Sequence, residues 1–239
     1  MSNIAKEVAE AIGTFALCFV GGGAICIATM QGAGYAGLLG VAMAHGLVLS
    51  VAVSATMNIS GAHLNPAVTI AMLATKRIDG GGAVRYILAQ LIGGTIAGAL
   101  LLAMFQGVTT TGGDEVVQAA KLGTPHFEAP ITAGRAILIE VPLTFLLVFA
   151  IFGTAVDPRA PKIGGFGIGL AVAADILIGG PLTGAAMNPA RTFGTGIVAA
   201  LSGNLDVFWK QHYVYWIGPI VGALLAAFTY DKLIMEKRA

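Results

Sequence analysis

The motif Asn-Pro-Ala occurs twice in the chain, as Asn65-Pro66-Ala67 and as Asn188-Pro189-Ala190, and the two copies lie in matching sequence contexts at 60–69 and 183–192. Asn is a favoured N-cap and Pro is favoured at the first helical position, so each copy predicts an abrupt helix start. The Asn side-chain oxygen can cap the helix amides while its NH2 group remains a donor. Together with the positive end of a helix dipole, such a donor can bind the oxygen of a neutral solute and disfavour a cation.

The composition indicates that these helix starts lie inside a membrane. Hydrophobic residues make up 56% of the chain and charged residues 10%, whereas soluble domains carry about 25% charged residues. Non-helical backbone at membrane depth is tolerated only where it is buried in protein or lines a water-filled cavity. We therefore expect the two motifs to meet in a pore. The net charge of +1 gives no reason to propose a nucleic-acid partner.

The apolar stretches predict an all-α membrane protein. A spanning helix needs roughly 20 apolar residues, and six stretches are long enough, at about 8–28, 38–58, 83–106, 134–156, 163–181 and 212–232. Two shorter apolar stretches follow the motifs, near 65–75 and 188–198, and these predict half-helices.

The two halves of the chain repeat more than the motif. Each half begins with Glu-x-x-x-Thr-Phe, at Glu10 and at Glu140, and each ends with Tyr followed by Gly-x-x-x-Gly, at Tyr86 and at Tyr213. Three spans separate the halves, so they insert with opposite orientation as an inverted repeat. We interpret 1–239 as a single domain, with repeats at about 1–106 and 134–239 and a linker at about 107–133.

The basic residues predict that both termini are cytoplasmic, because cytoplasmic loops carry an excess of Lys and Arg. The loops on the side of the termini hold the larger set: Lys6, Lys76, Arg77, Arg85, Arg159, Lys162, Lys232, Lys237 and Arg238. The opposite loops hold Lys121, Arg135 and Lys210.

A few charged and aromatic residues within the spans need their own interpretation. Charges inside a membrane usually face a cavity or a partner, so Arg191 is expected to line the pore. We interpret Glu10 and Glu140 as buried anchors for the motif loops, with a proton-relay role as the alternative. Asp175 is expected to have a local hydrogen-bond partner or a neighbouring subunit. The aromatic cluster near the last span suits a membrane-interface belt, and comprises Tyr213, Tyr215 and Trp216.

With these residues in place, the chain closely resembles the major intrinsic proteins, the aquaporin family. The resemblance rests on Glu10 to Phe15, on Ser60 to Thr69, on Gly184 to Gly194 and on Tyr215 to Pro219. It implies an aquaporin-like bundle of six transmembrane helices and two half-helices, a homotetramer, and a selectivity filter of four residues. Counted from the motifs, these are His45, Ile176, Ala185 and Arg191. That set looks like the plant tonoplast intrinsic proteins, in some of which a linker His joins the filter; His126 is the candidate here.

We therefore expect a passive water channel. The pore is expected to offer a row of backbone carbonyls, from Gly61, Ala62, His63, Gly184, Ala185 and Ala186. The filter, widened by Ile176 and Ala185, leaves open the passage of ammonia, hydrogen peroxide or urea.

Two other functions remain open as alternatives. One is a facilitator mainly for ammonia, urea or glycerol, and a more remote one is a coupled secondary transporter, which also suits inverted repeats. No carboxylate pair, metal cluster or nucleophile–base set stands in a plausible site, so no enzyme activity, metal or cofactor is expected. The expected surroundings are a lipid bilayer, with a cell membrane favoured and a vacuolar-type membrane left open.

Overall fold

The computed structural model describes residues 2–32, 37–203 and 205–235, and these residues form helices with no strand beyond one isolated bridge between Thr109 and Glu115. Lys237 and Arg238 lie outside the described residues. The long helices are α1 (Asn3–Gln31), α2 (Gly37–Ser60), α4 (Gly80–Phe105), α6 (Ala133–Ile151), α7 (Phe166–Thr183) and α10 (Val214–Thr229). Helices α6 and α10 continue into the π-helical turns η2 (Phe152–Val156) and η3 (Tyr230–Ile234). In the described ranges, 6 helices are long and apolar enough to cross a membrane, so the predicted spans are confirmed.

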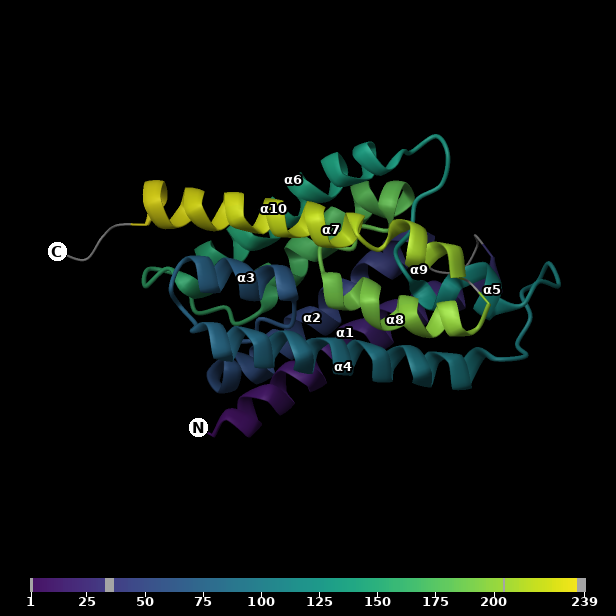
Figure 1. Ribbon diagram of the computed structural model, residues 1–239, viewed down its shortest axis with the longest axis horizontal. Coiled ribbons are helices and arrows are strands. Elements are labelled where there is room, and N and C mark those ends of the chain that lie inside the picture. Colours follow the sequence, from purple (N-terminus) through teal and green to yellow (C-terminus); the bar gives the residue numbers. More distant parts are fainter. Residues whose placement is uncertain (1, 33–36, 204, 236–239) are drawn as a thin grey trace.

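Two short helices lie between the long ones. Helices α3 (Pro66–Ala74) and α8 (Pro189–Leu201) both begin at the Pro of a motif, with Asn65 and Asn188 as their N-caps. Helix α3 extends toward the end of the bundle where the termini lie, and α8 extends toward the opposite end (Figure 1). We call these ends the termini side and the linker side. Both half-helices are therefore present, and they run in opposite directions from a common centre.

The close packing of the halves follows the inverted repeat. Helix α1 packs against α2 and α4, and α6 packs against α7 and α10. A Cβ atom at Gly93 would overlap the carbonyl of Ala11 in α1, and one at Gly222 would overlap the carbonyl of Val141 in α6. Small residues let membrane helices approach in this way. Gly93 and Gly222 therefore occupy equivalent places in the two halves.

This equivalence corrects the register that the sequence suggested for the ends of the repeats. The Tyr86 hydroxyl donates to the Ser60 carbonyl at 2.8 Å, and the Tyr215 hydroxyl donates to the Thr183 carbonyl at 2.7 Å. Tyr86 thus corresponds to Tyr215, two residues beyond the Tyr213 that the Gly-x-x-x-Gly spacing suggested. The Gly-x-x-x-Gly spacing gave the wrong pairing because more than one glycine in each helix could form the close contact. Only the residue that each glycine contacts in the structure distinguishes these registers.

Tyr215 also departs from the expected interface belt. Tyr213 is 49% exposed and Trp216 is partly exposed, as an interfacial position requires, but Tyr215 is 0% exposed. Its ring is buried because its hydroxyl finds an acceptor inside the bundle. Tyr215 therefore belongs to the support of the second motif loop.

The linker and the last loop contain short helices that the sequence did not predict. These are α5 (Val116–Ala120), the 3₁₀ turn η1 (Lys121–Gly123) and α9 (Leu205–Gln211). The first two pack against α1, with Val116 and Leu122 fully buried, and Gly123 lies against the backbone of Gly22. The linker is therefore part of the folded bundle on the linker side. Elements this short do not produce a readable hydrophobic period.

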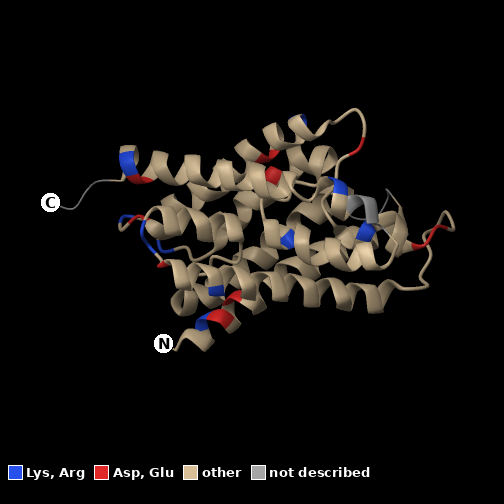
Figure 2. Cartoon of the chain, in the orientation of Figure 1, with Lys and Arg blue, Asp and Glu red and all other residues tan. Residues whose placement is uncertain are grey.

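Charged residues lie mostly at the two ends of the bundle, and the long helices between them are largely uncharged (Figure 2). Many large apolar side chains of these helices are exposed, including Leu39 at 62%, Val51 at 68%, Leu138 at 71% and Ile178 at 68%. Exposed apolar surface on this scale suits contact with lipid or with other membrane helices.

Candidate functional site

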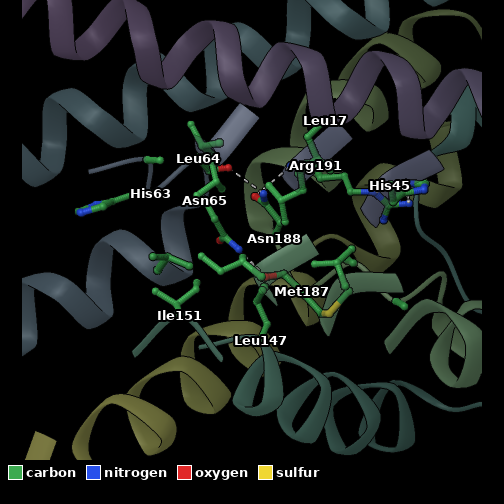
Figure 3. Close-up of a pocket in the computed structure, with 18 of the residues that line it drawn as sticks. Leu17, His45, His63, Leu64, Asn65, Leu147, Ile151, Met187, Asn188 and Arg191 are labelled. Carbon is green, nitrogen blue, oxygen red and sulfur yellow. Dashed lines mark hydrogen bonds between the residues drawn. The ribbon is translucent and has the colours of Figure 1, made fainter. Parts of the chain in front are cut away.

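The two motif Asn residues are linked to each other's loops at the centre of the bundle. Asn65 Oδ1 accepts the amide of Ala67 at 2.9 Å, and Asn188 Oδ1 accepts the amide of Ala190 at 3.0 Å. Asn65 Nδ2 donates to the Met187 carbonyl at 2.7 Å, and Asn188 Nδ2 donates to the Leu64 carbonyl at 2.9 Å (Figure 3). An amide nitrogen carries two N–H donors, so each Asn keeps a second N–H beyond this bond.

Glu10 holds the first motif loop in place. Its carboxylate accepts four hydrogen bonds, from Ser60 Oγ at 2.6 Å, the amide of His63 at 2.9 Å, the amide of Leu64 at 2.6 Å and Gln90 Nε2 at 2.7 Å. A buried carboxylate needs such donors, because an unpaired charge in the interior is costly. Glu10, a residue of α1, therefore fixes the loop that leads into α3.

Glu140 does the same for the second motif loop, with one donor fewer. It accepts from Thr183 Oγ1 at 2.7 Å, from the amide of Ala186 at 2.9 Å and from the amide of Met187 at 2.8 Å. Pro219 stands one turn after Tyr215, where Gln90 stands one turn after Tyr86. Pro lacks a side-chain donor, so the second anchor has no partner corresponding to the Gln90 amide.

Both loops contain residues in the left-handed backbone region. Ala62 and Leu64 have φ values of 51°, Ala185 has a φ of 42° and Met187 has a φ of 51°. Such conformations cost an ordinary L-residue roughly 1–2 kcal/mol each. The bonds to the two Glu side chains compensate for this cost and keep the loops out of a helical conformation.

These loops leave backbone carbonyls without protein donors. In the part of the chain that the structure describes, no hydrogen bond from a protein donor reaches the carbonyls of Gly61, Ala62, His63, Ala185 and Ala186. The Gly184 carbonyl differs, because it accepts from Arg191 Nη1 at 3.3 Å. Of the six carbonyls expected to serve a solute, five are thus open and one is shared with Arg191.

Arg191 and His45 meet on the linker side of the Asn pair. Arg191 Nε and Nη2 lie 3.2 Å and 2.9 Å from His45 Nε2, and both side chains are buried. His45 Nδ1 lies 2.8 Å from the Val41 carbonyl, to which it donates. Ile176 and Ala185 line the same cavity as this pair. The structure therefore brings the four expected filter residues together.

A narrow cavity joins these groups. It is lined by both motif Asn residues, by His63 and by the four residues expected to form the filter, and its volume open to the centre of a water molecule is about 30 Å³. A single water needs at least about 10–15 Å³ by this measure, so there is room for only a few water molecules. His63 stands at one end of the labelled set, the Asn pair in the middle, and Arg191 with His45 at the other end (Figure 3).

A wider cavity of about 600 Å³ opens on the linker side and shares Ile176 and Arg191 with the narrow cavity. His126 lines this cavity. Its Nδ1 lies 2.9 Å from the Thr124 carbonyl and its Nε2 lies 3.7 Å from Glu128 Oε1. Burial lowers the pKa of His126 below its ordinary value. We call this wider cavity the vestibule. His126 lies in its wall together with Ile176 and Arg191, and among the described residues no hydrogen bond joins His126 to the expected filter residues.

For Asp175 the sequence left two alternatives, a local hydrogen-bond partner or a neighbouring subunit, and the second stays a prediction. The residue is 2% exposed, and its Oδ2 has no hydrogen-bond partner among the described residues.

Sequence reasoning missed several supporting residues, including Ser60, Thr183, Gln90, Leu64 and Met187. Ser60 and Thr183 could have been identified from the sequence, because each has a side-chain hydroxyl and directly precedes the Gly at the start of a repeated motif loop.

Comparisons with known proteins agree with this geometry. The family described as Major intrinsic protein matches residues 1–230. The chain is 44% identical over 237 residues to "Aquaporin TIP4-4" of Zea mays, with 96% of this chain and 86% of that protein covered. It is 40% identical over 257 residues to "Aquaporin AqpM" of Methanothermobacter thermautotrophicus, covering 99% of this chain and 100% of that protein. The aquaglyceroporin structure from Plasmodium falciparum superposes with a TM-score of 0.85 at 26% identity, covering 98% of this chain and 97% of that chain.

Proposed function

Because the chain belongs to the major intrinsic protein family, we propose that this integral, multi-pass membrane protein is a passive channel for water whose filter also admits small neutral solutes. The observation that carries the proposal is the meeting of two capped helix N-termini, with two Asn amides between them, in a cavity with room for only a few water molecules.

The Asn pair orients water and disfavours cations. Each Asn uses one N–H on the opposite loop and keeps a second for solute. A water oxygen held by Asn65 and Asn188 points its hydrogens away from the centre, so it cannot easily accept a proton from its neighbours in the file. The N-termini of α3 and α8 add partial positive charge at the same point.

The rest of the proposed water path is lined by hydrogen-bond acceptors, the loop carbonyls, and it has a fixed cation, Arg191, on the linker side. The open loop carbonyls replace the hydrogen bonds that water loses on entry. Arg191 has five N–H donors, of which three point to His45 and to the Gly184 carbonyl. The remaining two are available to a solute, while the charge repels cations.

The filter composition supports a second group of solutes. Ile176 and Ala185 present only carbon atoms, while His45 and Arg191 keep the other wall polar. Ammonia, hydrogen peroxide and urea are small, neutral and able to hydrogen-bond with such a wall. A facilitator mainly for these solutes or for glycerol is the alternative that the same two apolar residues support. We further propose that His126, in the vestibule wall, influences which solutes reach the filter.

We also propose the arrangement of the protein in its membrane. The whole chain acts as one channel domain, because the loop of each repeat is bonded to the Asn of the other. The excess of Lys and Arg on the termini side supports cytoplasmic termini. Exposed apolar residues on the long helices suit a homotetramer within the bilayer, and a cell membrane is favoured over a vacuolar-type one.

Stopped-flow shrinkage of proteoliposomes in an impermeant osmolyte tests the water proposal. We expect faster shrinkage than in protein-free vesicles, and loss of the excess in Ile176→Trp, whose ring would fill the filter. Ile178→Trp lies on the same helix but is 68% exposed, so it should conduct like the parent. Parent protein that shrinks no faster than empty vesicles would refute the proposal. Ammonia entry, followed with an internal pH dye, separates a strict water channel from a broader one.

A further inference from the structure

A third cavity lies at the termini-side mouth of the pore. Its volume is about 590 Å³, and its walls come from the start of α1, the end of α2, the turn between α3 and α4, and the first turns of α4. It shares His63 with the narrow cavity. Anything bound in it would stand beside the entrance to the water path.

The charges in this termini-side cavity are unbalanced. Lys6, Lys76 and Arg77 line it, together with a single carboxylate, Asp79. Asp79 Oδ1 accepts the amide of Gly82 at 2.8 Å as the N-cap of α4, and its single negative charge is set against three positive ones. The cavity wall therefore carries an excess of positive charge.

The three cations differ in how they are held. Arg77 donates to Asp231 at 2.8 Å, and its guanidinium carbon lies 5.0 Å from the centre of the Phe152 ring. In the described part of the chain, the side chains of Lys6 and Lys76 have neither an ion pair nor a hydrogen bond. Two ammonium groups thus line a concave site, and neither has an ion-pair partner among the described residues.

The turn that carries Lys76 has a defined shape. Lys76 has a φ of 61°, in the left-handed region that favours Gly. The amide of Lys76 donates to the Leu73 carbonyl at 3.0 Å, and that of Arg77 donates to the Met72 carbonyl at 2.8 Å. These two bonds form the Schellman motif that ends α3 after its C-cap Thr75, so the helix end fixes the backbone from which the Lys76 side chain extends.

We propose that the termini-side cavity binds a phosphate-bearing anion through Lys6 and Lys76, assisted by Arg77, and that the bound anion slows flow through the mouth at His63. Lys ammonium groups bind phosphate as point charges, and a concave site with convergent polar groups is the usual form of a small-ligand pocket. The phosphate can belong to a free anion or to a lipid headgroup at the membrane surface. The effect on flow rests on the proposed channel function, whereas the binding does not.

Direct binding is the first test. Isothermal titration of the detergent-solubilised protein with inorganic pyrophosphate should show a binding signal, and the Lys6→Gln/Lys76→Gln double variant should bind at least about tenfold more weakly. Lys162→Gln is the matched control, because Lys162 is an exposed termini-side cation that does not line the cavity. Equal affinity of parent and double variant, or equal weakening in the control, would overturn the proposal. Matching melting temperatures show that the double variant is folded.

Flow and lipid measurements then test the second part and identify the source of the phosphate. In phosphatidylcholine vesicles, pyrophosphate on the termini side should slow osmotic shrinkage of the parent but not of the double variant, each compared with its own rate without pyrophosphate. Slowing by phosphatidylinositol phosphate in the bilayer, without pyrophosphate, would assign the site to a lipid headgroup. Binding with unchanged flow in both arms would overturn the obstruction. Absence of channel flow in every sample would instead refute the proposed function.

Discussion

Arg191 of α8 is bonded to His45 of α2, with its Nε and Nη2 at 3.2 Å and 2.9 Å from the same His45 nitrogen, Nε2. Because His45 Nδ1 donates to the Val41 carbonyl, the ring carries its proton on Nδ1 and offers Nε2 as an acceptor. The guanidinium is therefore fixed at one edge by α2, and at the other by the Gly184 carbonyl of its own loop.

Replacing His45 with Leu should loosen this arrangement. Two guanidinium N–H groups lose their acceptor, and hydrogen bonds to charged groups are worth about 1.5–3 kcal/mol each. We expect a lower melting temperature in detergent and a higher ratio of urea to water flow, because the filter loses a ring and Arg191 loses the acceptor that holds it in place. Met43→Leu, on the same helix but 38% exposed, is the control. An unchanged melting temperature together with an unchanged flow ratio would show that the pair does not shape the filter.

The two buried carboxylates should be far more sensitive than a surface one. In Glu10→Gln or Glu140→Gln, an NH2 group replaces one acceptor oxygen and leaves at least one loop amide unpaired, at a cost of about 1–3 kcal/mol. Glu7→Gln breaks only the partly exposed pair with Arg85, for which about 0–1 kcal/mol is expected. Thermal unfolding in detergent should therefore rank both buried variants well below Glu7→Gln. Equal unfolding temperatures for all three would remove the anchoring role.

Close helix packing gives a prediction with an internal control. A Cβ at Gly93 would overlap the backbone of Ala11, which cannot move aside as a flexible side chain can. Gly93→Ala should separate α4 from α1 and sharply reduce the yield of folded protein. Gly80→Ala adds a methyl group where nothing lies within 4 Å, so it should fold as well as the parent. Size-exclusion chromatography after detergent extraction compares the two, and equal monodisperse yields would contradict the packing argument.

The sequence predicted the membrane helices and half-helices because their signals are local. An apolar stretch of about 20 residues predicts a membrane span, and an Asn-Pro pair predicts a helix start, without information from the rest of the chain. The sequence matched Tyr86 with Tyr213 instead of Tyr215, because the repeated glycines allow several registers. The contact of Gly222 with Val141, which decides between these registers, is visible only in three dimensions. Helices α5 and α9 were missed because they are too short to show a period.

The candidate site divides in the same way. Asn65, Asn188 and Arg191 could be singled out because a repeated motif or an intramembrane charge marks them. Gln90 could not, because a lone amide on an apolar helix has no repeat partner, and only the fold brings it to Glu10 and Thr69. The sequence also gave no sign that each Asn amide donates to the loop of the other repeat. These bonds depend on how the two repeats pack against each other.

His126 gives a prediction about pH. Burial holds the pKa of His126 below its ordinary value of about 6.5, so the unfolded chain takes up a proton there before the folded protein does. Stability should therefore fall as the pH decreases below about 6.5, and it should fall less in His126→Gln. Melting temperatures between pH 7.5 and pH 5.5 measure both slopes. Parallel slopes for parent and variant would show that His126 does not titrate differently on folding.

Ala185 provides a chemical test of the path itself. It lines the narrow cavity beside Arg191, whereas the native thiols Cys18 and Cys26 are buried at 1% and 0% exposure and do not line that cavity. The parent should therefore conduct water normally after treatment with a membrane-impermeant organomercurial. Ala185→Cys should lose most of its flow on treatment and recover it after a reducing thiol, because a bulky adduct would fill a cavity this narrow. Ala103→Cys, on an exposed part of α4, should be modified without losing flow. If Ala185→Cys reacts and still conducts, water does not pass this residue.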